Sequence, residues 1–371
     1  GNNQGGLYFT RGDNIEWFDY VGGAYKLRYI TNAVYRDTSA WYHILAHFDN
    51  SLGSPEAKIY VNGVEQSLST STNYTQNQTT SWNNNYTFDI GSASTGTYFD
   101  GSMTHFYFIQ NQKYAPTTFG ETDSTSGIWK PKTAPTIDYS ATGSNSCLLK
   151  FENSGNMDLD SGSNNVSFTT SGTLTQNVDT PSNNFATLNA LKKLTGTLSN
   201  GNTTWTANGD NGVWSTIGDN SGKWYWETKN NANSTMCGIA SEDVTQATSR
   251  SENTGVYGVQ NGTTYAYYRN NGSNGQSSGF PNPTNSNVVC HALDLDNGKY
   301  FMGVDGVFKN LSGTTSNLST GADPTYSGLD TTKFWFPFIE CRGNSAGANI
   351  NFGQGYFGTT AVASAGTAPS E

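Results

Sequence analysis

The chain is short of charged residues and of long apolar runs. Charged side chains make up 13% of its 371 residues, against roughly 25% in a typical globular domain. No apolar run approaches the roughly 18 to 20 residues that span a bilayer, so we expect no membrane insertion. The formal net charge is −10 and no stretch is rich in lysine or arginine, which argues against a nucleic-acid partner.

Cysteine is also scarce, and its spacing excludes two common roles. The four cysteines, Cys147, Cys237, Cys290 and Cys341, form no Cys-x-x-Cys pair, so a zinc site is not expected. The last three lie in apolar, strand-like runs, and we interpret them as small buried hydrophobes. We therefore expect synthesis in a reducing cytosol and no stabilising disulfide.

What the chain has instead is aromatic residues among small polar ones. The aromatic fraction is 13%, whereas disordered chains are poor in aromatics. Large rings can build a core with few aliphatic residues. No segment shows sustained helical periodicity. We predict an all-β chain of many short strands joined by polar loops, long enough for two domains.

Two stretches share one strand-and-turn pattern. Residues 40–49 are followed by residues 57–64, which turn at Asn62-Gly63. Residues 288–296 turn at Asn297-Gly298 and run on to a second turn at Asp305-Gly306. These dipeptides suit the type I′ turn, which needs positive φ at both central residues. The repeated pattern predicts two antiparallel β-sandwiches.

Glycine, proline and small polar residues mark the expected boundaries of strands and domains. We expect further strands at residues 88–91 and 99–109 and a polar loop over residues 67–87. We predict a first domain over residues 1–135 and a linker with an added strand at 148–151 over residues 136–186. A second domain over residues 187–358 and a flexible tail over residues 359–371 follow.

Both domains resemble known families. The motifs at residues 40–43, 59–63 and 99–103 resemble the concanavalin A-like, laminin-G-like jelly roll. Those at residues 222–227, 292–296, 336–339 and 351–353 resemble a SPRY sandwich. The intervening segments at residues 114–123, 127–131 and 179–185 are similar to a linker in virion structural proteins of tailed bacteriophages, especially marine, cyanophage-like ones.

The resemblance implies a role in a virus particle. It implies a non-enzymatic tail fibre, capsid fibre or decoration protein, extracellular in the virion after synthesis in the host cytoplasm. Its partners would be other virion proteins and a host-surface glycan or protein, and we expect a homo-oligomer by analogy with fibres. Such jelly rolls usually begin well before the Trp41 motif, so we also predict an internal fragment or processed product that lacks its first strands. The alternatives are a secreted cellular lectin or adhesin and a polysaccharide-degrading enzyme.

No constellation predicts catalysis. Glycosidases need paired carboxylates on one strand face, but Glu121-Thr122-Asp123 continues without a second glutamate and is interpreted as a loop. His43 and His47 would lie roughly 13 Å apart on a strand, too far for one metal ion. Because some laminin-G-like domains hold calcium at their rim, Asp49 is the candidate for a calcium ligand. We expect no other metal or cofactor.

The candidate binding residues come from one aromatic cluster. Tyrosine on an exposed face can stack on a sugar or anchor a protein contact, although one face of such a strand should be core. The resemblance to SPRY domains, in which loops at one end bind partners, also implies binding by the loops at residues 230–235 and 270–279. The candidates are Tyr257, Tyr265, Tyr267, Tyr268, Arg269, Asn270 and Asn271.

Overall fold

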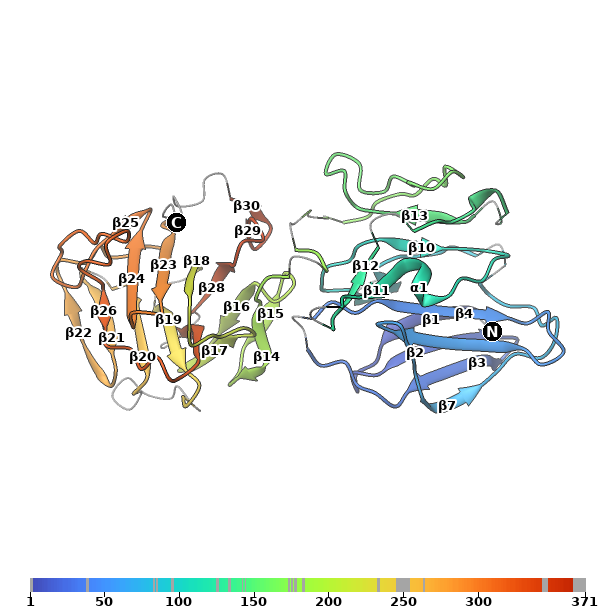
Figure 1. Ribbon diagram of the computed structural model, residues 1–371, viewed down its shortest axis with the longest axis horizontal. Helices are drawn as coiled ribbons and strands as arrows, with labels where there is room; N and C mark the ends of the chain where they lie inside the picture. Colours follow the sequence, from blue (N-terminus) through green and yellow to red (C-terminus); the bar gives the residue numbers. More distant parts are fainter. Residues whose placement is uncertain are drawn as a thin grey trace. The chain divides into compact units, whose positions relative to one another are not determined.

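The computed structural model is almost entirely β-structure (Figure 1). It describes residues 3–37, 40–82, 84, 86–94, 97–124, 127–132, 135–141, 143, 145–172, 174, 176, 179–181, 184–231, 234–244, 254–262, 264–341 and 346–362. All strand pairs within these segments are antiparallel, and none of their helices is long and apolar enough to cross a bilayer. The prediction of an all-β chain is confirmed.

The chain forms two compact units, which we describe separately. Unit 1 comprises Gly1–Phe99, Met103–Gln176 and Thr180–Asn184; unit 2 comprises Asp100–Ser102, Asn177–Asp179 and Phe185–Glu371. The strand expected at 148–151 is observed as β13 (Cys147–Leu149), which pairs with β10 (Phe106–Phe108). Much of the segment predicted as a linker therefore packs within unit 1.

Unit 1 is a sandwich of two sheets. One has the order β1-β2-β3-β7, with bounds Gln4–Phe9, Ile15–Val21, Ala24–Thr31 and Leu68–Thr72. The other has the order β4-β5-β6, with bounds Ile44–Asp49, Glu56–Val61 and Val64–Glu65. Alternate side chains of both sheets meet in one core, led by Ile15, Trp17, Leu27, Tyr29, Ile59 and Val61.

Shorter elements complete unit 1. They are β8 (Ser92–Ser94), β9 (Thr97–Tyr98), α1 (Pro116–Phe119), β11 (Gly120–Thr122), β12 (Trp129–Pro131) and the 3-10 turn η1 (Tyr139–Ala141). β8 pairs with β9 and β11 with β12.

Unit 2 is a larger sandwich. Its seven-stranded sheet has the order β14-β17-β27-β19-β20-β21-β22, with bounds Leu188–Lys193, Asn211–Ser215, Trp335–Cys341, Thr235–Ser241, Val256–Gln260, Ala266–Asn270 and Ser273–Ser277. The eight-stranded sheet comprises β15 (Thr197–Ser199), β16 (Thr204–Ala207), β28 (Ala346–Asn351), β18 (Lys223–Asn230), β23 (Val289–Asp294), β24 (Lys299–Val304), β25 (Val307–Phe308) and β26 (Tyr326–Ser327). Buried residues of both sheets form one core, so the prediction of two antiparallel sandwiches is confirmed.

Two of the three predicted type I′ turns are confirmed. Asn62 and Gly63 have φ of 48° and 80°, and Asp305 and Gly306 have the same pair of values. The prediction at Asn297-Gly298 is wrong. There β23 ends at Asp294 and β24 begins at Lys299, so the connection has four residues, and only Gly298 has positive φ. The Asp294 carboxylate accepts hydrogen bonds from the Asn297 backbone and side chain, which stabilises this longer turn.

Several strand predictions need correction. β4 begins at Ile44, so residues 40–43 precede the strand. The run at 99–109 contains only β10, because His105 has φ of 50° and interrupts an extended chain. Residues 88–91 form no strand. The predicted loop over 67–87 contains β7, whose β-branched Thr70 and Thr72 pair with β3.

The predicted C-terminal tail contains part of a short hairpin, and the cysteines are buried as expected. The predicted tail begins with a short hairpin between β29 (Tyr356–Phe357) and β30 (Thr360–Ala361), and residues 363–371 lie outside the described residues. All four cysteines are free and buried, which confirms their interpretation.

Candidate functional site

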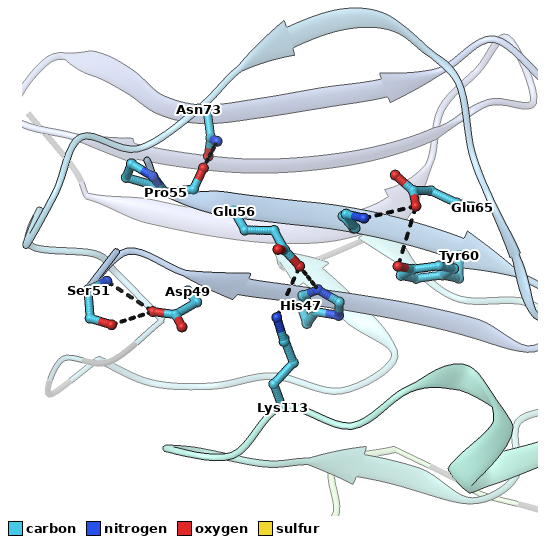
Figure 2. A network of polar contacts seen from close by, with 10 residues as sticks. His47, Asp49, Ser51, Pro55, Glu56, Tyr60, Glu65, Asn73 and Lys113 are labelled. Carbon is cyan, nitrogen blue, oxygen red and sulfur yellow. Dashed lines mark hydrogen bonds and ion pairs between the residues drawn. The ribbon is translucent and has the colours of Figure 1, made fainter. Parts of the chain in front are cut away.

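The predicted histidine and calcium positions lie on the outer face of β4 and β5 (Figure 2). Ala46 and Phe48 of β4 and Ala57 and Ile59 of β5 contribute to the core of unit 1. Side chains alternate along a strand, so the residues between them face outward. These are His47 and Asp49 of β4 and Glu56, Lys58 and Tyr60 of β5.

Ion pairs connect most of this outer face. Glu56 Oε1 accepts from Lys113 Nζ at 3.2 Å and lies 3.0 Å from His47 Nε2. Lys58 Nζ lies 3.0 Å from Glu65 Oε2. Most of these groups are partly exposed, so the pairs contribute little to stability individually. Together they fix the orientation of the side chains seen in Figure 2.

Asp49 and Glu56 are the one pair on this face that could suggest a glycosidase. They are direct cross-strand partners, and a retaining glycosidase holds its two carboxyl groups about 5–5.5 Å apart. Such an enzyme needs one of them protonated, with a raised pKa. Hydrogen bonds from Ser51 lower the pKa of Asp49, and those from His47 and Lys113 lower the pKa of Glu56. Both carboxyl groups are thus held ionised, as in a structural network.

The two histidines do not converge on a shared site. His43 stacks on Trp129 with ring centroids 5.7 Å apart, and burial lowers its pKa. His47 instead contacts Glu56. Asp49 Oδ1 accepts from the Ser51 backbone and hydroxyl at 3.0 and 2.6 Å. Within the described segments, no group of three or more His, Cys, Asp or Glu residues could hold a metal ion. Calcium binding at Asp49 stays a prediction.

The acidic triplet near Pro116 is not a loop. Glu121 and Thr122 belong to β11, and Asp123 follows in the turn toward β12. Lys130 Nζ lies 2.9 Å from Asp123 Oδ2 and 4.0 Å from Glu121 Oε1. The sequence missed this hairpin because its strands have only three residues each.

The predicted tyrosine cluster divides between the core and the surface of unit 2. Tyr257 is buried in the core, so we leave it out of any binding surface. Tyr265 is exposed, whereas Tyr267 and Tyr268 are half-buried on opposite faces of β21. Arg269 is also buried, and its guanidinium donates to Glu340 at 2.6 Å. The structure therefore brings Tyr267 and Arg269 to one outer face and removes Tyr257 from it.

The two segments expected as partner-binding loops are only partly loops. Asn270 and Asn271 are exposed, but residues 266–277 form the β21–β22 hairpin. Asn271 and Gly272 make its turn with φ of 48° and 89°. An Asn-Gly signal was present in the sequence and was missed among the surrounding Asn, Ser and Gly. The loop at 230–235 joins β18 to β19, and residues 232 and 233 lie outside the described residues.

An aromatic outer face on unit 1 was not predicted. Trp17 and Leu27 point into the core, so their neighbours on β2 and β3 face outward, together with Tyr8 of β1. We call this surface the aromatic face; it comprises Tyr8, Glu16, Phe18, Tyr20, Tyr25 and Arg28. Period-two alternation in residues 15–21 is the sequence signal that could have identified it.

Ring contacts run continuously along the aromatic face. Tyr8 meets Phe18 at 5.9 Å, Phe18 meets Tyr25 at 6.2 Å, and Tyr25 meets Tyr20 at 5.1 Å, all edge to face. Phe18 lies over Gly6, where an added Cβ would come within 2.8 Å of its ring. Tyr8 and Tyr25 are nonetheless 41% and 43% exposed. The contacts hold the rings in place while leaving part of each open to solvent.

An ion pair lies among these rings. Arg28 Nε donates to Glu16 Oε1 at 2.9 Å, and the Tyr8 hydroxyl donates to Glu16 Oε2 at 2.8 Å. The Arg28 guanidinium also lies 4.8 Å from the centroid of the Tyr25 ring. Burial and the bond to Glu16 raise the pKa of Tyr8 to about 12. The aromatic face thus combines open ring surface with a fixed, mutually neutralised pair of charges.

The comparisons with known proteins agree with the first sandwich. Residues 1–112 match a laminin-G-type family model described as the concanavalin A-like lectin/glucanases superfamily. This part of the chain therefore has a laminin-G-like fold, a class typically used for binding. A search of curated proteins found no match.

Solved structures of two SPRY domains are similar to 45% of the chain. The SPRY domain of human HERC1 is 13% identical, with a TM-score of 0.35, over 45% of this chain and 98% of that one. The PSpry domain of TRIM65 is also 13% identical, with a TM-score of 0.34, over 45% of this chain and 91% of that one. Likeness at this level carries no argument about function, and the SPRY assignment of the second sandwich stays a prediction.

Proposed function

We propose that this chain is a non-enzymatic binding protein of a bacteriophage virion. It would be a tail fibre, capsid fibre or decoration subunit that contacts a host-surface glycan or neighbouring virion proteins. The lectin-type match over residues 1–112 supports binding. The resemblance of residues 114–131 and 179–185 to a phage virion linker supports the location.

The aromatic face is the observation that carries the binding role. A sugar ring presents an apolar face of C–H bonds and a rim of hydroxyl groups. Tyr8 and Tyr25 offer open aromatic surface for the first. Arg28 offers donors for the second, because the bond from Nε to Glu16 uses one of its five guanidinium N–H groups and no other described residue accepts from the rest.

The charge of the aromatic face favours a neutral glycan. Glu16 neutralises Arg28 at 2.9 Å, and the other members, Tyr8, Phe18, Tyr20 and Tyr25, carry no charge at neutral pH. A phosphate or carboxylate ligand would have to compete with Glu16 for the guanidinium. A neutral glycan leaves that ion pair intact and still gains charge-assisted hydrogen bonds.

Locating the protein on purified particles tests the virion part of the proposal. Immunogold electron microscopy with antibody against the chain should label the tail or the capsid surface of intact particles. The same antibody should label host cells only where particles adhere. Labelling of uninfected cells, with unlabelled particles, would instead assign the chain to the cellular lectins or adhesins.

A further inference from the structure

A hollow lies on unit 2, on the outer face of β20, β21 and β22. Val259 of β20 and Ala266 of β21 belong to the core, so the next residues, Gln260 and Tyr267, face away from it. The hollow measures about 190 Å³, and its lining residues are Gln260, Tyr267, Tyr268, Arg269, Asn274, Gly275 and Gln276. This volume is below the roughly 300–1,000 Å³ of sites for drug-sized ligands.

Strand register places the lining groups in two adjacent rows. Tyr267 pairs with Gln260 on one side and with Gln276 on the other. Arg269, two residues further along the same face, pairs with Gly258 and with Asn274. Gly258, which lies in the row of Arg269 and Asn274, contributes no side chain. The hollow is therefore surrounded by amide and phenol groups beside a gap left by Gly258.

A buried ion pair runs along this gap. Arg269 on β21 reaches Glu340 on β27 at 2.6 Å, with β20 and β19 lying between these strands. Three strand spacings amount to about 14 Å. Gly258 and Gly238 on the two intervening strands are in register with Arg269, whereas Glu340 is in register with Gln260 through Met236. The side chains of Arg269 and Glu340 are only 5% and 0% exposed.

Gln260 is the residue that points to a ligand. It is only 7% exposed and lines the hollow. Among the described residues, no protein group makes a hydrogen bond to its side-chain amide. Its amide atoms are not among the fully buried polar atoms without a partner, so they stay open to the hollow. Its donor and its acceptor are therefore available to whatever fills the hollow.

We propose that the hollow binds one neutral pyranose residue of a glycan. A volume of about 190 Å³ corresponds to roughly six water molecules at about 30 Å³ each, the size of a single sugar ring. The amides of Gln260, Asn274 and Gln276 each supply a donor and an acceptor, as hydroxyl groups require. Tyr267 adds an aromatic ring to the same wall.

The ion pair decides the charge of the ligand. Because Glu340 neutralises Arg269, the hollow has no unbalanced cation to attract a phosphate or carboxylate. The uncharged amides do not favour a ligand of either sign. The hollow is formed by side chains of unit 2 alone, so it does not depend on the aromatic face of unit 1. The choice of a glycan rests on the proposed function.

The test measures binding of neutral oligosaccharides by ligand-observed NMR. The probes are oligosaccharides of glucose, galactose, mannose and N-acetylglucosamine, presented to the intact chain. Gln260→Met keeps the size of the side chain and removes its amide. Gln112→Met makes the same change at an exposed glutamine outside the hollow. Tyr25→Ala removes a ring from the aromatic face, and the double variant combines it with Gln260→Met.

We expect Gln260→Met to weaken the binding of at least one sugar about tenfold, which equals about 1.4 kcal/mol. Its melting temperature and the binding of Gln112→Met should match the wild type. Equal sugar binding by Gln260→Met and wild type would contradict sugar binding in the hollow, whatever the affinity of Tyr25→Ala. Loss in Tyr25→Ala alone would support the aromatic face only. A protein partner lost by Gln260→Met, with no sugar bound, would also overturn the sugar assignment.

Discussion

Arg269 and Glu340 form an ion pair of 2.6 Å between strands that are not neighbours in their sheet. Gly258 and Gly238 on the intervening strands are in register with Arg269, whereas Glu340 is in register with Met236 and Gln260. An added Cβ at either glycine would clash with backbone atoms of the adjacent strand. One long side chain thus connects two strands that are not hydrogen-bonded to each other.

Removing the arginine should be costly. Arg269→Met leaves the Glu340 carboxylate buried without its counter-charge, which typically costs about 3–5 kcal/mol. Urea unfolding of unit 2, followed by hydrogen exchange of amides in β20 and β27, measures the loss. Arg36→Met is the matched control, because Arg36 pairs with Asp13 at an exposed site and should cost under about 1 kcal/mol. Equal losses in the two variants would contradict the buried pair.

Unit 2 should be sensitive to mild acid through His291. Its ring stacks on Trp226 at 4.9 Å and contacts Thr228 and Tyr300, and burial lowers its pKa from 6.5 to about 3. In the unfolded chain His291 is therefore protonated below about pH 6.5, whereas in folded unit 2 it is protonated only below about pH 3. The free energy of unfolding of unit 2 should fall steadily as the pH falls through this window.

Two variants isolate this effect. His291 is the only histidine after residue 105, so His291→Gln should flatten the dependence of the unit 2 melting temperature on pH between 6.5 and 4. The variant should also be less stable at pH 7, because it loses the packing of the imidazole. His105→Gln in unit 1 should leave the unit 2 slope unchanged. An unchanged slope in His291→Gln would show that another group governs acid unfolding.

Gly6 should be essential for the aromatic face. An added Cβ there would come within 2.8 Å of the Phe18 ring, so Gly6→Ala should displace Phe18 and, through it, Tyr8 and Tyr25. We expect weaker glycan binding and a lower melting temperature of unit 1. Gly53→Ala is the control, since nothing lies within 4 Å of the added atom. Unaltered ring signals of Phe18 in the Gly6→Ala NMR spectrum would contradict the packing.

The cysteines should not react in the folded protein. All four are buried, and burial raises the pKa of Cys147 to about 11 and of Cys237 to about 12. Thiolate, the reactive form, is therefore scarce at neutral pH. A colorimetric thiol reagent should label none of them until denaturant is added and all four afterwards. Rapid labelling of the native chain would contradict their burial.

Some of the structure could be predicted from local sequence signals, and some could not. Asn62-Gly63 and Asp305-Gly306 set their turns because the signal lies within two residues. Asn297-Gly298 failed because Asp294, three residues earlier, stabilises a longer turn. Alternation separates Tyr267 from Tyr268 but does not decide which of them faces the core, and nothing local marks Arg269 as buried. Its partner Glu340 is 71 residues away and becomes a neighbour only when the sheet forms.

The aromatic face shows the same limit. Its residues lie on the three neighbouring strands β1, β2 and β3. That Tyr8, Phe18 and Tyr25 share one open face depends on the register of three strands and on a bulge beside Asp19. Strand register is set by tertiary packing as well as by the turns, so sequence alone did not assemble this face.

The most direct test of the binding role is affinity electrophoresis of the intact chain in gels containing neutral host-envelope polysaccharide. Wild type should be retarded without releasing sugar, and Tyr25→Ala should lose about tenfold in apparent affinity, or about 1.4 kcal/mol. Tyr98→Ala changes a tyrosine that is 71% exposed outside the aromatic face and should be retarded like wild type. Equal mobility with and without polysaccharide, or equal retardation of wild type and Tyr25→Ala, would contradict binding through the aromatic face.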